Sequence, residues 1–293
     1  MPLTSALCRS AAAALCLLAG LPSALAQTAP TAPTAPEPAA SAPDVPASAP
    51  RPPTRWEGAI GLILHHEPSY SGSGEMVDKA VPAFYLRYGR FTITNASVFV
   101  TRRQDDVLRG ASADLLRSDT LRVNLALRVD NGRRETASDR LTGLGEVKRT
   151  VRGRLSLGWN FAPDWRLSLG LSPDLLGHGG GTSFDAGVVR DFRLGPRSVV
   201  SLGTGLTYGN ARNLQSYYGV TPEQSARTGY AVYTPGAGLT GTSVSLGWRG
   251  DINERWTAFA TGSASRMLGP VLDSPIVTGT RNWSVSSGLA WRF

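Results

Sequence analysis

Arginine and aspartate recur at alternate positions in several stretches of this chain, and their side chains could bind anions or one another. Alternate spacing places side chains on one face of a β-strand. We expect one face to carry Arg122, Arg128, Asp130, Arg152, Arg154, Arg166, Asp185, Asp191, Arg193, Arg249, Asp251 and Arg292. Guanidinium groups bind carboxylates and other anions through paired hydrogen bonds. The face therefore either lines an aqueous, anion-preferring path or closes through cross-strand Arg–Asp pairs, with the segment 210–241 folding inward.

Histidine offers little further chemistry. The chain contains His65, His66 and His178. A hydrolase would need a nucleophile within hydrogen-bond reach of one of them, and the sequence has no Gly-x-Ser-x-Gly elbow. Because no cysteine follows residue 26 and no carboxylates are spaced as metal ligands, we expect no metal and no cofactor. We interpret the histidines as solvated residues at the rim of the fold and the protein as a non-enzyme.

The elements that would position these charges are strands with a period of two. In 119–131, for example, leucine and valine alternate with arginine and asparagine. Two of the segments, 91–102 and 106–117, alternate poorly. The expected strands are 55–65, 80–90, 91–102, 106–117, 119–131, 148–161, 165–176, 182–194, 198–209, 242–252, 256–266 and 282–293.

The connections between these strands alternate in length. Short turns fall at 162–164, 195–197 and 253–255, while long loops fall at 66–79, 132–147, 210–241 and 267–281. This alternation is typical of an all-β fold, a transmembrane antiparallel up-and-down β-barrel of about 12 strands. The apolar face would then meet lipid and the polar face would line the interior. An aromatic belt is expected near the short-turn rim from Trp56, Trp159, Trp165, Trp256 and Trp291.

The first part of the chain has a different composition. Residues 1–26 combine Arg9, an apolar core and Ala24-Leu25-Ala26, which predicts an export signal. Residues 27–53 are rich in proline and alanine and predict a disordered periplasmic linker before a barrel over 54–293. The net charge of +8 comes from arginines scattered singly along strands. Export and the lack of a basic patch argue against a nucleic-acid partner.

Five segments resemble signatures of a known family. They are Tyr217-Tyr218-Gly219-Val220-Thr221-Pro222-Glu223-Gln224-Ser225-Ala226-Arg227, Ser265-Arg266-Met267-Leu268-Gly269 with Asp273-Ser274-Pro275-Ile276-Val277, Leu141-Thr142-Gly143-Leu144-Gly145-Glu146, and His178-Gly179-Gly180. These segments are similar to those of the MipA/OmpV outer-membrane family, over about 56–293. The resemblance implies an outer-membrane barrel of a Gram-negative bacterium, without known catalytic residues.

The resemblance also implies partners. It suggests a scaffold that brings a lytic transglycosylase together with a murein (peptidoglycan) synthase, in contact with outer-membrane lipid. Two alternatives remain open from the residues themselves. One is a porin-like channel for small solutes with an Arg-rich lumen, and the other is a surface adhesin acting through its long loops.

Overall fold

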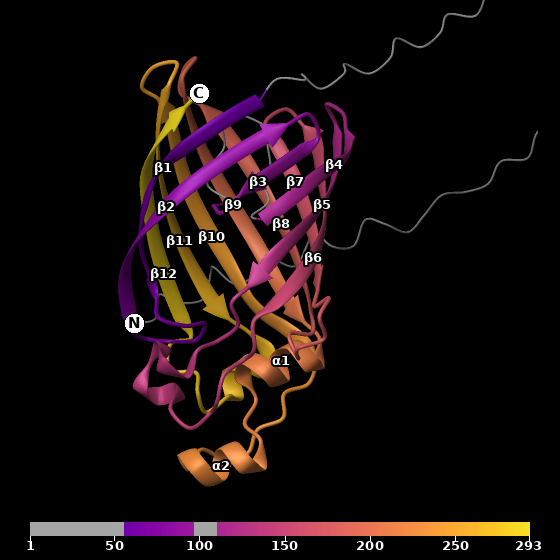
Figure 1. The fold of residues 1–293 in the computed structure, drawn as a ribbon, viewed down its shortest axis with the longest axis vertical. Helices are drawn as coiled ribbons and strands as arrows, with labels where there is room; N and C mark the ends of the chain where they lie inside the picture. The colour runs from indigo at the N-terminus through magenta and orange to yellow at the C-terminus, as the bar shows by residue number, and fades with distance from the viewer. Residues whose placement is uncertain (1–55, 97–109) are drawn as a thin grey trace, which may run out of the picture. The chain divides into compact units, whose positions relative to one another are not determined.

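The computed structural model describes residues 56–96 and 110–293, and these residues form a closed barrel of twelve antiparallel strands (Figure 1). This confirms the predicted fold class. The strands are β1 (Trp56–Pro68), β2 (Met76–Tyr88), β3 (Phe91–Thr94), β4 (Gly110–Arg117), β5 (Leu121–Asp130), β6 (Thr150–Ala162), β7 (Trp165–Pro173), β8 (Thr182–Arg193), β9 (Ser198–Gly209), β10 (Gly238–Asp251), β11 (Trp256–Met267) and β12 (Arg281–Arg292).

Each strand pairs with its neighbours in the chain, and β12 returns to pair with β1. The closing register sets Ile60 opposite Trp291 and Leu62 opposite Leu289. A closed sheet satisfies every strand's hydrogen-bonding groups on both sides, which a lipid environment requires. The described helices include none that is both long and apolar enough to cross a membrane.

The alternation in the sequence becomes two faces of different polarity. On β5, Leu125, Leu127 and Val129 are 46 to 55% exposed on the outside, whereas Asn124 and Ala126 on the other face are buried. Apolar side chains exposed on such a scale would be unfavourable in water and are favourable in lipid. The barrel exterior is therefore the lipid-facing surface.

The expected tryptophan belt is present at the short-turn end. Trp56, Trp159, Trp165 and Trp256 are exposed on the exterior, and Trp256 lies directly opposite Trp291 in the β11–β12 register. Neighbouring rings reinforce the belt, with centroids 4.8 Å apart for Trp56 and Tyr88. Aromatic rings of this kind prefer the boundary between hydrocarbon and headgroups.

Several strand ends differ from the prediction. The first hairpin is longer than expected, because Lys79 pairs with Glu67 at 2.7 Å and His66 with Asp78 at 2.6 Å across its end. The expected loop 66–79 therefore shortens to 69–75. Strand β3 ends at Thr94, before the predicted 102, and the part of that prediction beyond 96 lies outside the described residues, as do the predicted signal 1–26 and linker 27–53.

The expected polar interior holds for only part of the circumference. On the inner side of β1, β2 and β11, the buried residues Ile63, Tyr85 and Phe259 pack together with small alanines. The pattern obscured this because Ile63 continues an apolar run along β1 in which both faces carry apolar residues. The interior thus contains an apolar cluster on this side, whereas charged residues lie along β5 to β8, on β2 and β4, and on β10 and β12.

The long connections contain helices that strand periodicity did not predict. Loop 210–237 holds α1 (Ala211–Tyr218) and α2 (Pro222–Thr228), and the loops 131–149 and 268–280 hold the 3₁₀ turns Glu135–Ala137, Asp139–Leu141 and Gly269–Asp273. A capping box of Thr221 and Gln224, followed by Pro222 at the first position, starts α2, and Gly229 with φ 75° ends it. Both α-helices lie at the end of the barrel away from the C-terminus (Figure 1).

The lipid-facing assignment predicts a large effect of a charge on the exterior. Leu125 lies in the middle of β5, opposite Leu155. We expect Leu125→Arg to lower the free energy of unfolding by about 2–4 kcal/mol, because a guanidinium at mid-bilayer must leave water. Denaturant unfolding in lipid vesicles measures this. Leu125→Ala is the control, and an Arg variant no less stable than the Ala variant would contradict the assignment.

Candidate functional site

The best-buried charge in the described interior is Arg152 on β6. Its guanidinium lies 2.5 Å from the carboxylate of Asp130 at the end of β5. It also donates to the carbonyl oxygens of Gly180, at 2.8 Å, and Ser172, at 3.2 Å. Only 3% of Arg152 is exposed. Removing one partner of such a buried pair typically costs about 3–5 kcal/mol, since the other charge is left uncompensated.

A second interior pair spans one strand of the wall, from β6 to β8. Arg154 on β6 holds both oxygens of Asp185 on β8, at 2.6 and 2.7 Å. The intervening strand β7 carries Gly170 at that point, and a Cβ there would lie 2.4 Å from the Arg154 guanidinium. A side chain at position 170 would therefore force the Arg154 guanidinium and the Asp185 carboxylate to shift from this geometry.

A third group lies toward the short-turn end. Asp251 forms ion pairs with Arg292 at 3.0 Å and Arg249 at 3.5 Å, and it accepts a hydrogen bond from the Thr257 hydroxyl at 2.7 Å. Nearby, Asp191 accepts from Ser201 at 2.6 Å.

The remaining candidates fall into two sets. Arg193 pairs with Asp164 of the turn at 3.0 Å. Arg122, Arg128 and Arg166 occupy positions of the same alternation on β5 and β7. Most of the candidate charges therefore lie in Arg–Asp pairs with one another. This is the arrangement expected of an interior closed by cross-strand pairs.

One interior pair was not expected from the sequence. Arg87 on β2 is buried and lies 2.7 Å from Asp114 on β4. Arg87 precedes the poorly alternating segments and Asp114 lies within the second of them, where β4 carries an irregularity between Asp114 and Leu116. The shift of register breaks the period of two, so the pattern gave no signal for this pair.

The long-loop end is closed by a packed layer that we call the cap, formed by the loops 69–75, 131–149, 210–237 and 268–280. Helix α1 provides its centre. The Tyr217 hydroxyl donates to Asp130 at 3.1 Å, and the Tyr217 carbonyl accepts from Arg133 at 2.8 Å. These contacts tie α1 to the buried Asp130–Arg152 pair.

On its other side, α1 reaches the loops of distant strands. The Tyr218 hydroxyl lies 2.7 Å from Ser71 in the β1–β2 loop, and its carbonyl accepts from Ser274 in the β11–β12 loop at 2.5 Å. Burial raises the pKa of Tyr218 above its ordinary value. Since the β1–β2 and β5–β6 loops stand far apart around the ring, contacts to both mean that loop 210–237 crosses the barrel mouth.

Two apolar clusters fill the cap. One contains Tyr70, Leu141, Leu144, Val220 and Ile276, and the other contains Leu214, Tyr218, Met267 and Val271. The sequence segments 141–146, 217–227 and 265–277 thus meet in a single layer, although they are far apart along the chain.

A separate anchor shapes the loop between β7 and β8. Asp174 accepts from the amides of Leu176 and Gly177, each at 3.2 Å, and of Gly180 at 2.8 Å, and also from the Thr150 hydroxyl. Burial by itself would raise the pKa of Asp174, but these hydrogen bonds outweigh it and hold the pKa below its ordinary value. Asp174 falls inside the expected strand 165–176, but β7 ends at Pro173, so the strand pattern gave no sign of a loop anchor here.

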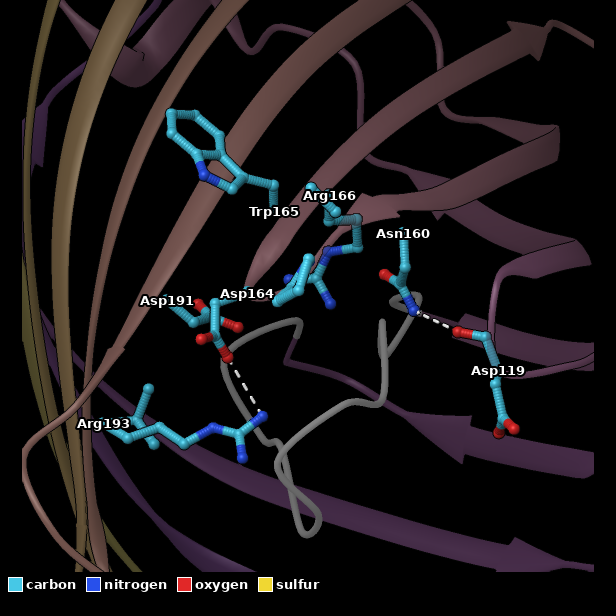
Figure 2. A pocket seen from close by; sticks show the side chains of 10 residues that line it. Asp119, Asn160, Asp164, Trp165, Arg166, Asp191 and Arg193 are labelled. Carbon is cyan, nitrogen blue, oxygen red and sulfur yellow. Dashed lines mark hydrogen bonds and ion pairs between the residues drawn. The ribbon is translucent and has the colours of Figure 1, made fainter.

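The opposite mouth contains a polar pocket of about 440 Å³ (Figure 2). Arg166, Asp191 and Arg193 extend into it from β7 and β8, and Asn160 donates to the carbonyl of Asp119 at its edge at 2.7 Å. Asp164 adopts a positive φ of 60° in the tight β6–β7 turn and lies beside Arg193 in the view. The pocket therefore offers both signs of charge at the short-turn mouth.

The three histidines make separate contacts. His65 lies 2.8 Å from Ser286, His66 contacts Asp78, and His178 contacts the carbonyl of Arg149 at 2.7 Å. His65 lies within β1, as the expected strand 55–65 places it, whereas His66 also lies within β1 and not in the expected loop 66–79. Among the described residues, no group of three or more His, Cys, Asp and Glu side chains could hold a metal ion.

A closed barrel with an apolar exterior and paired charges inside defines a membrane-spanning β-barrel of the outer-membrane class. The chain belongs to the MipA family, because the family described as MltA-interacting protein MipA matches residues 60–293. This confirms the predicted family.

Two curated relatives, the MltA-interacting proteins of Escherichia coli (strain K12) and Shigella flexneri, are each 25% identical to it over 163 residues. That similarity covers 55% of this chain and 63% of each relative, so it spans less than two thirds of their length.

Solved barrels give only distant likenesses. A NanC porin has a TM-score of 0.41 at 9% identity, covering 78% of this chain and 98% of its own. An anion-selective porin from Comamonas acidovorans has a TM-score of 0.36 at 9% identity, covering 82% and 99%. Because TM-scores this low do not establish a common fold, the barrel is assigned from its own strand pairing.

The depressed pKa of Asp174 predicts pH-dependent stability. A carboxyl whose pKa is lower in the folded state stabilises the fold above its ordinary pKa of about 3.9, and this is lost as the pH falls through the folded value. We expect Asp174→Asn to lower the Tm at pH 7 and to have a smaller effect near pH 3. Thermal unfolding of both proteins in detergent measures this, and an equal difference at the two pH values would refute it.

The cap predicts a low conductance. We expect the unmodified protein in planar bilayers to pass little steady current, because loop 210–237 crosses the mouth. Leu214→Ala with Tyr218→Ala removes buried side chains from the second apolar cluster, and should raise the conductance severalfold. Val232→Ala in the same loop, at a 53% exposed position, is the control. Unmodified protein that conducts as well as the double variant would contradict this prediction.

Proposed function

We propose that this protein is a non-enzymatic outer-membrane scaffold that holds a lytic transglycosylase together with a murein synthase. Family membership supports this role, as do the relatives named for interaction with MltA. The observation that carries it is the cap. A barrel whose long-loop mouth is crossed by packed loops, and in which Asp130, Asp185 and Asp251 are paired with arginines, is better suited to presenting a surface than to passing solutes.

The surface in question is the short-turn mouth, which faces the periplasm in outer-membrane barrels. Its rim is polar, and the pocket there exposes the Arg193–Asp164 pair, with 58% and 39% of the two side chains accessible. Exposed ion pairs contribute little to folding, about 0–1 kcal/mol. These two charges can therefore contact a protein partner and orient it without a large cost to folding.

Affinity capture tests the scaffold. The full chain, tagged and extracted in detergent from the envelope, should retain a lytic transglycosylase and a murein synthase that mass spectrometry identifies. Arg193→Glu should reduce their recovery severalfold, because it reverses a charge at the proposed contact. Glu223→Gln, on α2 at the opposite end, should leave recovery unchanged.

Two results would count against the proposal. One is the absence of murein enzymes under extraction conditions that preserve known envelope complexes. The other is equal recovery by the Arg193→Glu variant, which would exclude the short-turn mouth as the contact. A parallel capture without residues 27–53 separates binding through that segment from binding through the barrel. An anion-selective conductance of the intact protein would instead favour the channel alternative.

A further inference from the structure

A hollow of about 470 Å³ indents the exterior of β10, β11 and β12 near the long-loop end. These three strands lie side by side in the wall, coloured orange to yellow in Figure 1. Three outward residues form its apolar part in one cross-strand row: Val244, Ala264 and Trp283. The hollow exists because the small Ala264 stands between two larger side chains that are 54% and 52% exposed. Gly262, the next outward residue on β11 toward the short turns, leaves the adjoining space open.

The edge of the hollow nearest the long loops is basic. Thr242, Arg266 and Arg281 form the next outward row toward the long loops, and the two arginines lie directly opposite each other. Both arginines are exposed, and no carboxylate of the described residues lies within 4.0 Å of either guanidinium. Like charges directly opposite on neighbouring strands destabilise the pairing. An anion between them would remove that repulsion.

The order of the two rows matches the order of layers in a lipid leaflet. Tryptophan prefers the boundary between acyl chains and headgroups, and the Trp283 ring packs 4.9 Å from that of His66 on β1. The arginines stand one row beyond it, at headgroup depth, while Val244 and Ala264 continue toward the hydrocarbon. Guanidinium groups bind phosphate through paired hydrogen bonds.

We propose that this hollow binds one phosphate-bearing lipid of the outer leaflet. Its phosphate sits between Arg266 and Arg281, and an acyl chain lies over Ala264 between Val244 and Trp283. The inference stands independently of the scaffold role, because it concerns the lipid-facing exterior and not the short-turn mouth.

Native mass spectrometry of the full detergent-solubilised protein tests this. The probe is bisphosphorylated lipid A, titrated against the unmodified protein and the Arg266→Gln, Arg281→Gln double variant. We expect one lipid A to bind to the unmodified protein. We expect the double variant to bind lipid A with an affinity about tenfold lower or more, because two arginines near a lipid surface together strengthen binding by about that factor. Ala264→Leu, which fills the hollow and keeps both arginines, should also weaken binding.

The controls separate this site from general attraction. Arg190→Gln removes an exterior arginine at the other end of the barrel, where its guanidinium lies 5.1 Å from the ring of Trp165, and should leave binding unchanged. Dephosphorylated lipid A should bind weakly, and inorganic phosphate alone should not compete, because it lacks the acyl chains. Retained secondary structure, together with the mobility of unheated samples on SDS gels, verifies that each variant is folded. Equal binding by the double variant, equal loss in Arg190→Gln, or equal binding of the dephosphorylated lipid would overturn the proposal.

Discussion

The pairing of β1 with β12 is the interaction on which the rest of the structure depends. At its short-turn end, Gly58 and Phe293 exchange two backbone hydrogen bonds of 3.1 and 3.0 Å. An unpaired backbone group in hydrocarbon costs several kcal/mol, so an open edge along two strands would be prohibitive in a membrane. Phe293 also folds its ring over Gly58, where a Cβ would lie 2.4 Å from ring atoms. A side chain at position 58 would therefore displace the Phe293 ring from this position.

Closure confines the interior, and confinement determines how its charges behave. Arg152 is nearly inaccessible, and it is tolerated because a carboxylate and two carbonyl oxygens satisfy it. Arg154 and Asp185 achieve the same across a glycine. On the opposite side of the barrel, apolar residues such as Ile63 and Phe259 fill the space instead. The interior is therefore filled by paired charges around part of its circumference and by an apolar cluster on this side.

The cap joins this interior to the surface. Tyr217 contacts the Asp130–Arg152 pair directly, so the most buried charges and the longest loop form one connected unit. The opposite mouth has short turns and exposed, paired charges. A barrel built in this way has one end sealed by packing and one end presenting polar groups, which is the physical basis for assigning partner contact to the short-turn mouth.

The sequence alone determined the twelve-stranded barrel and the family, and it gave well-bounded strands wherever both faces differ in polarity, as on β5 and β6. It succeeded there because a period of two is a local property that side chains on one strand express without help from others. Where both faces are apolar, as around Ile63, or where the register shifts, as at Asp114, the pattern carried no such information.

Only the tertiary structure decided which charges meet. Arg152 reaches Asp130 on the neighbouring strand, Arg154 reaches past β7 to β8, and Asp174 anchors a loop through backbone amides. It also decided that loop 210–237 packs on loops far away in the chain, and that Arg266 faces Arg281. The physical reason is that cross-strand partners depend on the register and closure of the whole sheet. Residues with the same spacing in the sequence could pair, repel or stay exposed according to how those strands align.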